Sequence, residues 1–162
     1  AGIPDRIQVL SDLVRTSPAH RTWQPDLTMD SLKSLGVWLK DHVSVRAMTE
    51  KELREIDPVY PSPMDLRGET ITEETISVMI DVAMYLGQTF VSTFPGTIKW
   101  GRPVKGKRSA DYSLPYLDGF GRVTLNPIRM VMAQIGGVAN NTGTWRWDEV
   151  IEIWRRRAQG DP

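Results

Sequence analysis

The chain has 162 residues, no formal net charge, 40% hydrophobic residues and no cysteine. A chain of this length buries about 70% of the surface that its unfolded form exposes, so we expect a folded core and exclude disorder away from the ends. The lack of cysteine excludes disulfides, thiolate zinc sites and cysteine nucleophiles, and it favours a reducing compartment, which predicts a cytoplasmic protein.

Residues 1–57 predict a small helical subdomain. A first helix begins at Pro4 and ends before Ser17-Pro18. A second helix begins between Thr28 and Asp30, and its apolar side consists of Leu32, Leu35, Leu39 and Val43. A short third helix through Ile56 is indicated by the capping box Thr49-x-x-Glu52.

A proline-rich connector over residues 58–68 separates these helices from the rest of the chain, because its prolines exclude both a helix and an inner strand. Thr72 then caps a long helix that continues to Phe90 and has apolar residues on nearly every side. Its length approaches that of a membrane span. However, it contains Asp81, and an ionised residue costs about 2.5–3.5 kcal/mol at the centre of a spanning helix. We therefore expect a buried central helix and no membrane association.

The second half of the chain predicts three strands and two helices. The strands are Thr97 to Trp100, Tyr112 to Leu117 and Arg122 to Leu125, with residues 118–121 as a turn. Asn126-Pro127 begins a helix that Gly136-Gly137 is expected to end. The last helix starts near Thr144 and has one apolar face, formed by Trp147, Val150, Ile151 and Trp154.

Together these elements predict an α+β fold that is mainly helical, with a central buried helix and a small antiparallel sheet in the second half. We expect a single domain over residues 1–162, with an α+β core at 69–158.

A glycine-rich segment resembles a phosphate-binding loop but lacks its context. Gly101-x-x-x-x-Gly106-Lys107 is followed by Arg108, where a phosphate-binding loop has a Ser or Thr that binds magnesium. The next residues predict an extended segment instead of a helix. We therefore interpret residues 99–108 as a basic hairpin and expect no cofactor. Beside aromatic residues, such a hairpin suits nucleic-acid binding, although the neutral chain lacks a broad basic footprint.

Few residues are candidates for catalysis. The two histidines, His20 and His42, have no suggestive neighbours in the sequence and are expected to be structural or exposed. They also lack the close spacing of a metal site. Asp81 is the sharper candidate because a carboxylate in an apolar helix needs a partner or a shifted pKa. Arg122 or Arg129 would serve as that partner, and a structural ion pair is favoured over an active site.

The two halves of the chain carry opposite charges. Residues 1–81 hold nine Lys and Arg against fourteen Asp and Glu, whereas residues 82–162 hold eleven against six. Such asymmetry indicates either recognition of a partner or neutralisation of one half by the other.

A series of motifs over residues 70–157 resembles small bacterial proteins of the kind encoded beside polymorphic toxins, where they act as immunity proteins. The motifs are Val82-Ala-Met-Tyr-Leu-Gly87, Trp100, Leu117-Asp-Gly-Phe120, Asn126-Pro127 and Trp154. The resemblance implies a fold and a toxin partner, and it implies no catalytic residue.

We therefore expect a non-catalytic module that binds a protein partner, with neutralisation of a toxin as the specific hypothesis. The alternatives are a nucleic-acid-binding protein that uses the basic hairpin and an enzyme that uses Asp81. The candidate partner-binding residues form an acidic set and a basic set: Asp26, Asp30, Asp41, Glu50, Glu52 and Glu55, and Lys99, Arg102, Lys105, Lys107 and Arg108.

Overall fold

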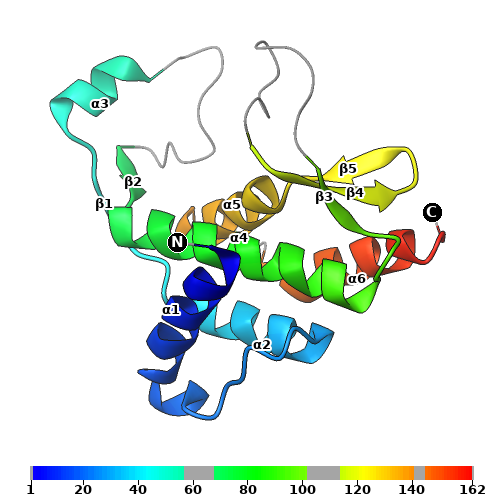
Figure 1. Ribbon diagram of the computed structural model, residues 1–162. Coiled ribbons are helices and arrows are strands. Elements are labelled where there is room, and N and C mark those ends of the chain that lie inside the picture. The colour runs from blue at the N-terminus through cyan, green and yellow to red at the C-terminus, as the bar shows by residue number, and fades with distance from the viewer. Residues whose placement is uncertain (1, 57–67, 102–113, 141–144, 162) are drawn as a thin grey trace.

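A computed structural model of the chain describes residues 2–56, 68–101, 114–140 and 145–161. Within these ranges it contains six α-helices, a 3₁₀ turn (η1, Pro18–His20) and five short strands (Figure 1). The helices are α1 (Ile3–Arg15), α2 (Met29–Lys40), α3 (Glu50–Glu55), α4 (Glu73–Thr93), α5 (Pro127–Ala139) and α6 (Trp147–Ala158). The predicted α+β fold, mainly helical, is confirmed.

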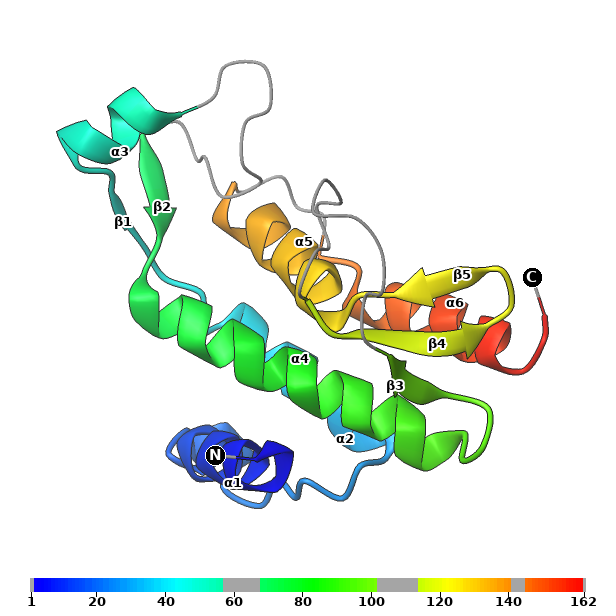
Figure 2. The same cartoon turned by 45° about the horizontal axis from the view of Figure 1, so that its top comes forward.

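Helix α4 is the centre of the fold. It packs against α1, α2, α5 and β3 (Lys99–Gly101), and Figure 2 shows it between α1 on one side and α5 with the sheet on the other. Met79, Val82 and Leu86 on this helix are buried, as the sequence predicts. One stripe of the helix remains open, because Ile76 and Ile80 are exposed.

The length and composition of α4 also suit a membrane span. Among the described residues it is the one helix with this property, and 56% of its most apolar 18-residue window is buried inside the fold. The apolar character of α4 is thus largely accounted for by its place in the core.

The sheet of the second half is antiparallel and has the order β3-β4-β5, with β4 at Tyr116–Phe120 and β5 at Val123–Leu125. The prediction that residues 118–121 form a turn is wrong for residues 118–120, which lie within β4. Asp118 and Gly119 lie within β4, where the register shifts between Leu117 and Phe120 and Gly119 has a φ of 112°. Glycine tolerates this left-handed backbone, so the strand continues through an irregularity in place of turning.

The structure differs from the sequence prediction in two further places: the end of helix α5, and a second sheet that joins α3 to the rest of the fold. Gly136-Gly137 does not end α5, which continues to Ala139, because tertiary packing against α4 outweighs the weak helix propensity of glycine. A second sheet, which the sequence did not predict, pairs β1 (Val45–Ala47) with β2 (Glu69–Ile71). These strands carry α3 away from the body of the protein, to the upper left of Figure 1, and we call β1, α3 and β2 together the arm.

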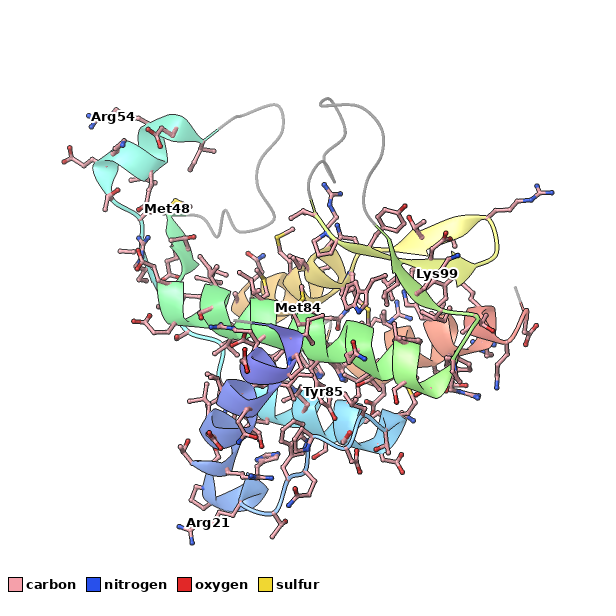
Figure 3. The ribbon with its side chains drawn as sticks, in the orientation of Figure 1. Arg21, Met48, Arg54, Met84, Tyr85 and Lys99 are labelled. Carbon is pink, nitrogen blue, oxygen red and sulfur yellow. The ribbon has the colours of Figure 1, made fainter. Side chains whose placement is uncertain are left out.

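Tyr85 ties α4 to the start of α2. Its hydroxyl hydrogen-bonds the Ser31 hydroxyl at 2.6 Å and accepts from the Leu27 backbone N–H at 3.1 Å. Figure 3 shows Tyr85 on the side of α4 that faces α2. Leu27 has a φ of 58°, which is uncommon for a residue with a side chain, and the bond to Tyr85 helps to hold this conformation.

Candidate functional site

The acidic set does not gather on one surface. Asp26 and Asp30 lie at the start of α2, and Asp41 follows its last residue. A helix of 12 residues is about 18 Å long, so these positions are at opposite ends. Glu50, Glu52 and Glu55 lie on α3, at the far end of the arm. The acidic residues therefore occupy three separate places.

Local structure already uses some of these carboxylates. Glu52 forms two hydrogen bonds with Arg46, at 2.7 and 3.0 Å, and accepts from the Thr49 backbone N–H. These contacts, with Arg46 foremost, lower the pKa of Glu52 to about 2. Hydrogen bonds from Ser31 and Thr28 likewise lower the pKa of Asp26. Glu52 and Asp26 thus stabilise the chain itself.

The basic set lies largely outside the described residues. Arg102, Lys105, Lys107 and Arg108 fall there, as does most of the segment that resembles a phosphate-binding loop. Lys99 is exposed on β3, where its Cα partner on β4 is Asp118. Figure 3 shows Lys99 on the opposite side of the molecule from Arg54 of α3.

Asp81 is buried, with 5% of its surface exposed, and it is paired. Its partner is Arg6 of α1, and neither Arg122 nor Arg129: the Arg6 Nε donates to Oδ1 at 2.6 Å and Nη2 donates to Oδ2 at 2.8 Å. Burial raises the pKa of Asp81, and the Arg6 guanidinium acts in the opposite direction. Because the guanidinium engages both carboxylate oxygens, Asp81 joins α1 to α4.

A groove lies between α2 and the start of α6. This α2–α6 groove has a volume of about 390 Å³. Its apolar part contains Val37 and Trp145, and charged side chains surround it: Lys33, Lys40, Asp41, Arg146, Asp148 and Glu149. Asp41 is thus the one residue of the acidic set that lines this groove.

A glycine on α2 fixes one wall of the groove. Trp147 is buried against Gly36, and a Cβ added at residue 36 would lie 2.1 Å from the indole ring, so only glycine fits there. The Trp147 Nε1 donates to the Leu32 carbonyl oxygen at 3.0 Å. Trp145 stacks on Trp147, with centroids 5.6 Å apart and planes at 7°. Trp147 is therefore held by α2 before any partner arrives, and Trp145, which precedes α6, stacks on it.

A second cluster lies at the other side of α2 and involves Ser17, Trp38 and His42. The His42 Nε2 is 3.1 Å from the Ser17 Oγ, and its Nδ1 is 2.7 Å from the Trp38 carbonyl oxygen. The Trp38 Nε1 donates to the Ser17 Oγ at 3.0 Å, and the Trp38 and His42 rings stack. We call these residues the Ser17–His42 cluster.

His42 is exposed, as expected, and the fold gives it partners that the sequence did not indicate. A turn between α1 and α2 brings Ser17 to a histidine that is 25 positions away. The spacing of Trp38 and His42 at i and i+4 near a helix end was the available signal, but nothing in the sequence placed Ser17 beside them.

No group of three His, Asp or Glu residues able to hold a metal ion occurs within the described ranges. Comparisons with protein-family models, with curated proteins and with solved structures find no match to this chain.

Proposed function

We propose that this protein binds a protein partner through the α2–α6 groove, and that it acts as an immunity protein that neutralises a toxin. The observation that carries the binding proposal is the composition of the groove. Val37 is 58% exposed and lies beside the stacked Trp145, with side chains of both charge signs around them. An apolar centre within a polar rim is the usual anatomy of a protein interface.

Tryptophan is one of the residue types that most often carry the binding energy of such an interface. Trp and Arg are enriched among the residues that carry most of the binding energy, and the groove contains Trp145 and Arg146. The Arg146 Nε donates to Glu149 at 2.7 Å, which orients the guanidinium at the rim. Since Trp147 is buried against α2 and Val37 lies on that helix, little ordering of this part of the groove is needed on binding.

The partner is proposed to be a toxin because of the motifs over residues 70–157 and because an inhibitor needs complementarity of shape and charge more than a reactive residue. The charges of the rim would then set the rate and specificity of association. Asp41 supports this role because it is exposed and lines the groove.

The test places a charge in the apolar centre of the groove. Capture of a partner from the native host by the full chain is compared between wild type, Val37→Glu and Val9→Glu. Val9 is a matched control, since it is 53% exposed and lies on α1. An unpaired carboxylate facing an apolar surface is costly, so we expect Val37→Glu to weaken binding by about thirtyfold or more, equal to ~2 kcal/mol.

Equal capture by wild type and Val37→Glu would exclude the groove as the binding site. The toxin role is tested by expressing the captured partner in a sensitive host with and without this protein. Growth that is restored by wild type and not by Val37→Glu is the expected result. Titration with short RNA and DNA at physiological salt tests the alternative, and tight, salt-sensitive binding there would favour a nucleic-acid ligand.

A further inference from the structure

The Ser17–His42 cluster has the arrangement of an activated nucleophile. A serine hydroxyl reacts when a base within hydrogen-bond reach removes its proton and a third group holds that base. Ser17 is half-buried and His42 is exposed, so the pair is reachable from solvent. Trp38, which holds both, is buried with 1% of its surface exposed.

The contacts determine which ring nitrogen of His42 carries the proton in the neutral form. The Trp38 carbonyl oxygen can only accept, so Nδ1 must be the donor across the 2.7 Å contact. Nε2 then has a free lone pair directed at the Ser17 Oγ, 3.1 Å away. The hydroxyl therefore donates to Nε2, which is the geometry of a general base and its nucleophile.

Trp38 acts on the serine as well as on the histidine. Its Nε1–H donates to the Ser17 Oγ at 3.0 Å, so it holds this oxygen beside the His42 Nε2.

We propose that Ser17 is a nucleophile activated by His42, and that it accepts an acyl group from small activated esters. The Oγ attacks the ester carbonyl carbon while its proton passes to His42 Nε2. The bond from that carbon to the leaving oxygen then breaks, and the leaving oxygen takes the proton from Nε2. The products are a Ser17 ester and the free alcohol. Water attacks this ester in the same way to restore the serine. The proposal does not depend on the protein-binding function.

The absence of cysteine allows a test that needs no substrate. Ser17→Cys introduces the sole thiol of the chain. We measure its pKa from the pH dependence of alkylation by iodoacetamide, alone and combined with His42→Asn. Asn can still donate to the Trp38 carbonyl but cannot act as a base. Ser92→Cys, at an exposed position of α4, is the control thiol.

A histidine that touches the nucleophile lowers the pKa of a thiol below the ~8.5 of free cysteine. We expect this for Ser17→Cys, with a return to the value of Ser92→Cys when His42→Asn is added. The proposal is overturned if the thiols at 17 and 92 titrate alike, or if His42→Asn leaves the thiol at 17 unchanged. A thermal melt of each variant confirms that it is folded.

The natural serine is tested with 4-nitrophenyl acetate. We expect acetylation at Ser17, located by mass spectrometry of peptides, and slowing by about 100-fold or more in His42→Asn, which is the usual contribution of a general base. His20→Asn is the matched control and should react like wild type. Acetylation that bypasses Ser17, or that is as fast in His42→Asn, would contradict the proposal.

Discussion

Asp81 shows how one buried charge organises the contact between α1 and α4. The carboxylate is removed from water, which raises its pKa, and the bidentate guanidinium of Arg6 replaces part of the lost hydration. Arg6 itself stays partly exposed, with 38% of its side-chain surface in contact with solvent. The ion pair therefore lies at the edge of the core, with a buried carboxylate and a partly exposed guanidinium.

We expect Asp81→Asn to lower the free energy of unfolding by about 1–2 kcal/mol at pH 7. This cost is moderate because Arg6, once unpaired, can be hydrated. Thermal or denaturant unfolding of wild type and variant gives the value, and Ser77→Ala, which removes only the 3.5 Å hydrogen bond from the Arg6 Nη2, is the comparison. No change in stability for Asp81→Asn would show that the ion pair makes no net contribution.

The change in the free energy of unfolding caused by Asp81→Asn should also depend on pH. A raised folded pKa means that the native state favours the protonated form of Asp81, so its contribution to stability is complete below the unfolded value of 3.8. This pH-dependent part of the contribution is lost as the pH rises through the folded pKa, and the contacts of the ionised carboxylate with Arg6 remain at pH 7. The Asn variant does not titrate at this position. The destabilisation caused by Asp81→Asn should therefore be larger at pH 3 than at pH 7.

The chemistry of Asp81 could be predicted from the sequence, but its partner could not. A lone acid in an apolar helix must be paired or shifted in pKa, and this part of the prediction is confirmed. Arg6 is 75 positions away, and the contact depends on how α1 packs across α4. The contact between Ser17 and His42 could not be predicted for the same reason, because it depends on the path of the chain between α1 and α2.

At the scale of elements, the capping signals were the most reliable part of the sequence. Thr28, Thr49, Thr72 and Asn126 each accept a hydrogen bond at the start of a helix, as expected for N-caps. Glycine was less informative. Gly119 and Gly136 suggested ends of elements, but both lie inside one, because packing decided whether the chain turned. The short strands β1 and β2 carried no clear signal.

The central position of α4 predicts the effect of truncating it. Leu86 has no exposed surface, so Leu86→Ala should lower the free energy of unfolding by about 2–5 kcal/mol. Ile80→Ala on the same helix is the control, since Ile80 is 40% exposed and its loss leaves no enclosed cavity. Equal unfolding midpoints for wild type and Leu86→Ala would contradict the central role of α4.

The arm has its own ion pair and its own pH dependence. The pKa of Glu52 is lowered to about 2, chiefly by Arg46, so this contact supports α3 above the unfolded value of 4.5 and is lost as the pH falls through about 2. NMR titration of the Glu52 carboxyl group should show this low pKa in wild type. In Arg46→Ala the pKa should move towards 4.5, while that of Glu152, held by Arg155, stays low.

For the whole molecule, the buried core forms one hydrophobic cluster, and α3 lies outside it. Buried residues from α1, α2, α4, α5, α6 and the sheet of the second half belong to the same hydrophobic cluster, whereas α3 has no buried residue. Amide hydrogen exchange should therefore be fast in α3, through local opening, and slow in the middle of α4, through global unfolding. Equal protection of α3 and α4 would mean that the arm folds with the core.

The stacked pair at the groove gives the protein an optical signal of its own. Trp145 and Trp147 lie nearly parallel, 5.6 Å apart, so their electronic transitions couple and the pair contributes a near-ultraviolet circular dichroism band that depends on this geometry. Trp147 is buried and fixed by Leu32, whereas Trp145 is partly exposed. A ligand that rotates Trp145 would change the band without any added dye, and comparison with Trp145→Phe identifies the part of the spectrum that belongs to the pair.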